Sequence, residues 1–97
     1  MATYRLTSDA DEDLRGIAEY TLEQFGLRQA ERYISGLQTC FAELADMSRL
    51  GRDYSHVKAD VRRYEHESHS VYYRITDYGI LILRVLHQRM DPGRHLQ

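Results

Sequence analysis

The stretch Ser70–His87, which reads SVYYRITDYGILILRVLH, decides the fold. Its two halves are rich in valine, isoleucine, leucine and tyrosine, residues that favour β-strands. Between them Asp77-Tyr78-Gly79 has the form of a three-residue hairpin loop with glycine in the left-handed position. This loop would pair Tyr73 with Leu83. The stretch therefore predicts two antiparallel strands joined by a tight turn.

The predicted register assigns the side chains of this hairpin to two faces. The face expected to meet the helices carries Val71, Tyr73, Ile75, Leu81, Leu83 and Val85. The opposite face carries Tyr72, Arg74, Ile80, Ile82, Arg84 and Leu86. Because the second set is too apolar to be left bare and too charged to form a sealed core, we predict that it binds a partner. Two alternatives stay open: the C-terminal tail folds over this face, or a central strand is apolar on both sides.

A third strand and a surface loop lie directly upstream. Residues 61–65 alternate in polarity and complete a three-strand antiparallel meander with 70–76 and 80–87. Residues 48–58 show no clear period and are rich in turn-forming and polar side chains, so we predict a surface loop there.

Two amphipathic helices precede the sheet. Ser8-x-x-Asp11 resembles a capping box that would begin the first helix, and Gly26 would end it. Apolar residues recur at steps of three and four through both segments, to about residue 46. They are Leu14, Ile17, Ala18, Thr21 and Phe25, then Ala30, Tyr33, Ile34, Leu37, Phe41, Leu44 and Ala45. Because the second helix follows Gly26 almost immediately, the two helices are expected to form an antiparallel hairpin.

With a further short strand over Thr3–Thr7, the prediction is an α+β fold. An N-terminal strand is followed by a helical hairpin that packs on a small, mainly antiparallel sheet. The 97 residues, 42% hydrophobic and 29% charged, fit one domain, residues 1–97. Neither a signal peptide nor an apolar run long enough to span a bilayer is evident, so we expect a cytoplasmic protein without membrane association. The lone Cys40 falls among helix-spaced apolar residues and is expected in the core.

Charge divides the chain into two halves. Residues 1–48 hold four arginines against nine acids, whereas residues 49–97 hold nine lysines and arginines against six acids and all five histidines. The surface is therefore expected to be polarised. A solvated acidic helix pair beside a mildly basic sheet would give the same pattern, so charge alone does not indicate nucleic-acid binding.

Most enzyme motifs are absent from the sequence. His66-Glu67-Ser68-His69 is one residue too short for the HExxH zinc motif and lies in a turn, so we expect no metal. GxSxG, P-loop and GxGxxG motifs are also missing, so we expect no cofactor. The strand cations Arg62, Arg63, Arg74, Arg84, His87 and Arg89 could support metal-independent RNA cleavage. Alternatively, these cations hold acidic partner segments or the carboxylates of the first helix.

Three segments carry a family resemblance. The run from Ile82 to Asp91, ILRVLHQRMD, is followed by Arg94-His95-Leu96; the opening has YRLT and DLRGIA; and the middle has RRY and HSVYYR. Together they resemble ParE toxins of bacterial type II toxin–antitoxin systems, within the RelE/ParE superfamily. The resemblance implies a toxin that inhibits DNA gyrase, is neutralised by a ParD-type antitoxin in a hetero-oligomer, and has no catalytic residues. No sequence-specific nucleic-acid binding is expected from the toxin alone.

The resemblance also gives the predicted sites a role. Tyr72, Arg74, Ile80, Ile82, Arg84 and Leu86 are the candidates for contacting an acidic, amphipathic antitoxin tail. His87, Arg89, Met90, Asp91, Arg94 and His95 are the candidates for contacting gyrase. RelE relatives are ribosome-dependent messenger RNA nucleases. If this chain were one of them, Arg63, Arg74, Arg84 and His87 would be the catalytic candidates.

Overall fold

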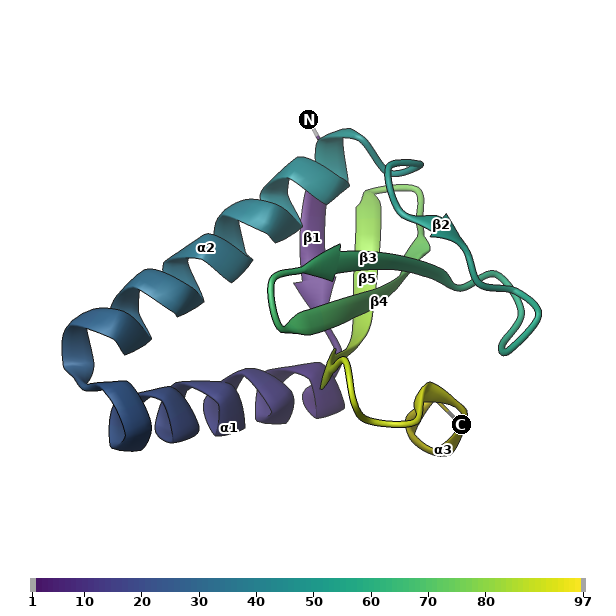
Figure 1. Cartoon of the computed structure of the whole chain (residues 1–97). Helices are drawn as coiled ribbons and strands as arrows, with labels where there is room; N and C mark the ends of the chain where they lie inside the picture. Colours follow the sequence, from purple (N-terminus) through teal and green to yellow (C-terminus); the bar gives the residue numbers. More distant parts are fainter. Residues whose placement is uncertain (1, 97) are drawn as a thin grey trace.

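The protein is a five-stranded mixed sheet with two long helices on one face (Figure 1). A computed structural model describes residues 2–96. The elements in chain order are β1 (Thr3–Leu6), α1 (Ser8–Phe25), α2 (Leu27–Asp46), β2 (Arg52–Asp53), β3 (Arg62–His66), β4 (His69–Ile75), β5 (Gly79–His87) and α3 (Pro92–His95). The strand order is β1-β5-β4-β3-β2, with only β1 parallel to its neighbour. The predicted α+β fold is confirmed.

The two long helices meet at Gly26 and diverge from it (Figure 1). Gly26 has φ +89°, a conformation that favours glycine, and its N–H donates to the carbonyl of Leu22 to end α1. The predicted capping box is wrong by one position. Thr7 caps α1, because its hydroxyl accepts from the Ala10 N–H at 3.1 Å and donates to the Leu83 carbonyl at 2.8 Å. One side chain thus caps the helix and ties it to β5.

The turn before β5 differs from the predicted left-handed glycine. Gly79 has φ +143°, and a Cβ there would lie 1.9 Å from the carbonyl oxygen of Thr3. Glycine is needed because β1 runs directly alongside the start of β5, with Thr3 opposite Gly79. This contact belongs to the parallel pairing of β1 with β5, which the hairpin pattern alone does not predict.

A β-bulge in β5 reverses the predicted faces. Tyr73 pairs with Ile82 and Tyr72 pairs with Arg84, which leaves Leu83 as an extra residue. The prediction of Tyr73 opposite Leu83 is therefore wrong by one residue on the turn side of the bulge. Because side chains alternate along a strand, a shift of one residue moves every side chain there to the other face.

The main core lies between the helices and the sheet. It contains Ala10, Ile17, Leu37, Cys40, Phe41, Leu44, Ala45, Val71, Tyr73, Ile80, Ile82 and Val85. Ile80 and Ile82, predicted on a partner-binding face, are fully buried there. Val71, Tyr73 and Val85 face the helices as predicted. Leu83, predicted with them, packs against a second cluster on the opposite face.

The segment predicted as a surface loop contains a strand. Arg52 and Asp53 pair with β3 and extend the antiparallel part of the sheet to four strands. Gly51 is buried; its N–H donates to the hydroxyl of Tyr73 at 2.8 Å, and its carbonyl accepts from Arg62 at 2.7 Å. Two residues are too short for a period-two pattern to be read from the sequence.

Candidate functional site

A groove of about 670 Å³ opens between α1, the start of α2 and the end of the sheet where β4 begins and β5 stops. We refer to it as the α1 groove. Its lining residues are Glu12, Asp13, Gly16, Ile17, Tyr20, Thr21, Phe25, Gln29, Tyr33, Glu67, Ser68, His69, Val85, His87 and Met90. A groove of this volume is large enough to receive several side chains of a partner.

The walls of the α1 groove carry large apolar side chains that the fold leaves exposed. Phe25 is 67% exposed, Tyr20 61% and Met90 40%. Exposed aromatic and methionine side chains gathered around one concavity are typical of protein-binding surfaces. Gly16 also lines the groove, and a Cβ added to it would meet nothing within 4 Å, so this part of α1 is open.

Tyr33, His69 and His87 line the α1 groove and contact one another in a row. The hydroxyl of Tyr33 lies 2.7 Å from Nδ1 of His69, and the His69 and His87 rings meet edge to face at 5.5 Å. Burial, with smaller contributions from the neighbouring His87 and His66, lowers the pKa of His69 to about 4. Burial also raises the pKa of Tyr33. Both side chains are therefore neutral near pH 7.

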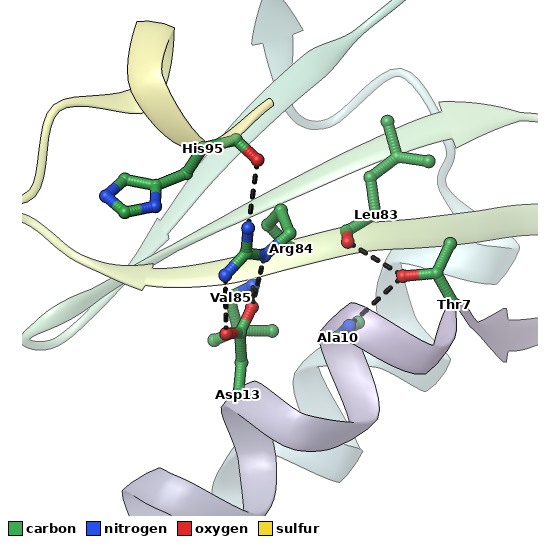
Figure 2. Close-up of polar contacts among 7 residues, drawn as sticks. All are labelled: Thr7, Ala10, Asp13, Leu83, Arg84, Val85 and His95. Carbon is green, nitrogen blue, oxygen red and sulfur yellow. Dashed lines mark hydrogen bonds and ion pairs between the residues drawn. The ribbon is translucent and has the colours of Figure 1, made fainter. Parts of the chain in front are cut away.

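A partly buried ion pair joins Asp13, which lines the α1 groove, to Arg84 on β5 (Figure 2). Arg84 donates from Nε and Nη2 to the two carboxylate oxygens of Asp13, at 2.8 and 2.9 Å, and from Nη1 to the His95 carbonyl at 2.9 Å. Asp13 also accepts the Val85 N–H at 3.0 Å. The hydrogen bonds to Asp13 raise the pKa of Arg84 further. One side chain thus joins α1, β5 and α3.

This ion pair confirms one of the roles considered for Arg84. The alternative that the strand cations hold carboxylates of the first helix is confirmed for Arg84, because Asp13 lies in α1. Within the chain its guanidinium is held by Asp13 and the His95 carbonyl, and the predicted contact of Arg84 with a partner stays a prediction.

The tail covers the second face of the sheet. Val61, Tyr72, Leu86 and Leu96 form a cluster in which each residue is at most 4% exposed, flanked by Tyr54 and Leu83. Asp91 accepts the Gly93 N–H at 3.0 Å and begins α3, which brings Leu96 onto the sheet. The alternative that the tail folds over this face is therefore confirmed. Partner binding at this face stays a prediction, and Leu96 already covers part of the face within the chain.

The structure separates the six predicted antitoxin contacts. Ile80 and Ile82 lie in the main core, Tyr72 and Leu86 in the cluster beneath the tail, and Arg84 in its ion pair. Arg74 is partly buried and lines two smaller hollows beside the tail and β2. A contact between the antitoxin and Tyr72, Arg74, Arg84 or Leu86 stays a prediction.

The four residues named for ribonuclease chemistry do not share one site. Arg74 and Arg84 line the same hollow of about 230 Å³, which Arg63 and His87 do not line. Arg63 instead donates to Ser70 at 3.2 Å and lies 3.3 Å from Glu65. His87 lies in the α1 groove. An arrangement of base, acid and phosphate-binding arginines around one point is therefore not formed by these four side chains.

The six residues predicted to contact a target follow β5 or end it. Arg89 and Met90 are exposed after His87, and Asp91 caps α3, in which Arg94 and His95 form the last turn. Met90 and His87 also line the α1 groove. Target binding by this segment stays a prediction, but the segment is an ordered turn and helix.

Sequence reasoning misses the α1 side of the groove. Tyr20 is off the predicted apolar stripe of the helix, and Phe25 is predicted in the core although it is two-thirds exposed. An aromatic residue outside the buried stripe of an amphipathic helix is the available signal. The groove combines residues of α1, the start of α2, the turn before β4 and the end of β5, and the periodicity of each helix does not predict that these segments meet.

Residues 2–96 contain neither a membrane-spanning helix nor a metal-binding cluster. No helix in this part of the chain is long and apolar enough to cross a membrane. No group of three or more histidine, cysteine, aspartate or glutamate side chains there is arranged to hold a metal ion. Cys40 is buried, and burial raises its pKa to about 11, which disfavours the reactive thiolate near pH 7.

A family model and several curated relatives match nearly the whole chain, and all of them are described as ParE toxins. Residues 4–92 match the family model described as the ParE toxin of the type II toxin–antitoxin system parDE. The chain is 36% identical over 94 residues to Toxin ParE1 of Mycobacterium tuberculosis, covering 96% of both chains. It is 35% identical over 96 residues to Toxin ParE1 of Caulobacter vibrioides, covering 99% of both. It is 36% identical over 92 residues to Toxin ParE of Escherichia coli, covering 94% of this chain and 89% of the relative.

A solved structure has a similar fold. It is described as a chromosomal ParDE TA system from P. aeruginosa, and it superimposes with a TM-score of 0.71 over 90% of this chain and 96% of its own. The sequence identity of 20% makes this a likeness of fold alone.

Proposed function

We propose a function for this protein from one premise, that the chain belongs to the ParE toxin family of type II toxin–antitoxin systems. The finer proposal is that this toxin inhibits DNA gyrase in the cytoplasm and is neutralised by a ParD-type antitoxin that docks in the α1 groove. The proposal that DNA gyrase is the target is supported by the family match. The exposed aromatic walls of the groove support the proposed docking site.

The α1 groove fits an antitoxin segment better than the face predicted from sequence does. That face is already covered by Leu96 and α3, whereas Tyr20, Phe25 and Met90 expose apolar surface with no covering segment among the described residues. A segment that folds as it binds would bury this surface and gain the hydrophobic free energy that the toxin alone leaves unused.

The gyrase proposal is tested with purified protein. We expect the toxin to block supercoiling of relaxed plasmid DNA by gyrase and to increase cleaved DNA, and its expression to induce DNA breaks. Supercoiling that continues unchanged at a large molar excess of folded toxin would contradict the proposed target. Messenger RNA from arrested cells should stay intact; codon-positioned cleavage would instead favour a ribonuclease.

The docking proposal is tested by coexpression with a ParD-type antitoxin encoded beside the toxin gene. We expect growth to be restored by wild-type pairs and a stable complex to be isolated. Phe25→Ala and Tyr20→Ala in the groove should weaken that complex about tenfold or more, because aromatic anchors carry much of the binding energy of an interface. Leu22→Ala is a matched control on α1, since Leu22 is 48% exposed but does not line the groove.

A further inference from the structure

We propose that the α1 groove selects a helical partner segment that is apolar on one face and positively charged at its flanks. This inference rests on the proposed docking of the antitoxin in this groove, and it reverses the charge expected from the sequence. The sequence favours an acidic antitoxin tail because the second half of the chain is basic. The groove, however, is built mainly from the acidic half.

The charges that line the groove have one sign. Glu12, Asp13 and Glu67 line it, and no lysine or arginine within residues 2–96 does so. Arg84, which does not line the groove, pairs with Asp13 and interacts at longer range with Asp9 and Glu12, so one cation faces several carboxylates. Glu12 forms no ion pair with a described residue, and Glu67 lies 3.4 Å from Nε2 of His66, which balances it only when that imidazole is protonated.

The surrounding surface of α1 extends the same field. This helix carries Asp9, Asp11, Glu12, Asp13, Glu19 and Glu23 but only one cation, Arg15, which pairs with Asp11 at 3.0 Å. An approaching acidic segment would therefore be repelled both along the helix and at the groove. A basic segment would be attracted before contact, which increases the rate of association.

The apolar walls determine the rest of the partner's chemistry. Ile17, Tyr20 and Phe25 line the groove from α1, Tyr33 lines it from α2, and Met90 lines it from the segment after β5. Apolar side chains at positions i, i+3, i+4 and i+7 of a helix would contact these walls. Flanking arginine or lysine side chains would reach the carboxylates of Glu12 and Glu67.

The experiment selects helical peptides without assuming an antitoxin sequence. A displayed library of 18-residue amphipathic peptides, with lysine, arginine, aspartate and glutamate at equal frequency in the non-apolar positions, is panned against the full-length toxin. We expect bound peptides to be enriched in lysine and arginine. The affinity of the selected peptides should fall about tenfold when the salt concentration is raised from 50 to 500 mM, because salt screens the charges at the rim of the groove.

Variants assign the effect to the groove. Glu12→Arg and Glu67→Gln should each weaken the selected peptides by about three- to tenfold. Glu23→Arg makes the same charge change on this helix outside the groove and should weaken affinity clearly less than Glu12→Arg does. Circular dichroism and a melting curve of each variant establish that it is folded.

Three outcomes would overturn the inference. These are acidic enrichment, selection with no charge bias, and equal losses in Glu12→Arg and Glu23→Arg. The result is independent of gyrase inhibition. If peptides were selected with the predicted charge but a ParD-type antitoxin failed to neutralise the toxin, the proposed function would fail while the chemistry of the groove stood.

Discussion

At the residue scale, Asp13 is the side chain that connects α1 to β5 through polar contacts. It accepts two hydrogen bonds from Arg84 and one from the Val85 N–H, and both members of the pair are less than one-fifth exposed. Asp13→Ala should lower the free energy of unfolding by about 3 kcal/mol, because it leaves a partly buried guanidinium without its partner. Urea denaturation measures this change.

A surface pair on the same helix provides the control. Arg15 and Asp11 form an ion pair of 3.0 Å, but the side chains are 76% and 47% exposed. Arg15→Ala should change the free energy of unfolding by less than about 0.5 kcal/mol. Equal losses for Asp13→Ala and Arg15→Ala would mean that the Arg84 pair has no special structural role.

His69 should make the stability of the protein depend on pH. Its pKa is lowered from 6.5 to about 4 by folding, so the unfolded chain takes up a proton at a higher pH than the folded protein does. The free energy of unfolding should therefore fall as the pH decreases from about 6.5 to about 4. Because the ring is only partly buried, we expect a loss on the order of 2 kcal/mol rather than the full value of the shift.

Denaturation curves at intervals from pH 7.5 to 4 measure this dependence. His69→Gln removes the titrating group and should flatten the curve in this window. His56→Gln is the control, since His56 is exposed in the loop before β3. A curve for His69→Gln as steep as that of the wild type would place the pH dependence on other groups.

At the scale of elements, β1 is positioned by the absence of a side chain at Gly79. Gly79→Ala would put a Cβ 1.9 Å from the Thr3 carbonyl oxygen in a backbone conformation that disfavours alanine. We expect a loss on the order of 3 kcal/mol in the free energy of unfolding. Hydrogen exchange should show reduced protection at Thr3 and Thr7, whose N–H groups donate to the Tyr78 and Ile82 carbonyls.

Gly16→Ala, the same substitution at another glycine, should raise the free energy of unfolding instead of lowering it. Gly16 lies within α1, and nothing lies within 4 Å of the added carbon. Alanine should therefore stabilise the protein by about 1 kcal/mol, since glycine is a poor helix former. If Gly16→Ala lowered the stability instead, the added methyl group would have to clash with a neighbouring group, which contradicts the open space around Gly16.

The tail is an element of the fold as well as a candidate contact. Leu96 is 4% exposed and covers Val61, Tyr72 and Leu86. Leu96→Ala should lower the free energy of unfolding by about 2 kcal/mol, measured by thermal or urea denaturation. A change below about 0.5 kcal/mol would mean that α3 detaches readily. Deletion of residues 89–97 would uncover the whole cluster and is therefore a poor test of target binding.

The sequence predicted the elements better than their faces. Apolar spacing located α1, α2 and the last three strands, and a glycine signalled the end of α1 at Gly26. The extra residue at Leu83 places Ile80 and Ile82 on the face predicted for Leu81 and Leu83. Strand periodicity does not reveal such a bulge, so the prediction had these faces reversed. The α1 groove could not be predicted either, since its lining residues are distant in the sequence and only the fold brings them together.

At the scale of the whole molecule, Arg84 links the two surfaces that we expect to act on partners. It binds Asp13 on the groove side and the His95 carbonyl on the tail side (Figure 2). The α1 groove and the exposed part of the tail are nevertheless formed by different side chains, apart from His87 and Met90. Neutralisation and toxicity should therefore be separable by substitution.

Three variants test this separation in cells that carry the toxin with or without its antitoxin. Phe25→Ala should stay toxic but escape neutralisation, because it removes an exposed groove anchor without disturbing the core. Arg89→Glu should lose toxicity but retain antitoxin binding, because Arg89 is exposed after β5 and does not line the groove. Arg84→Ala should weaken both, since it releases α1 and α3 together. If Phe25→Ala and Arg89→Glu behaved alike while both remained folded, antitoxin and target would share one surface.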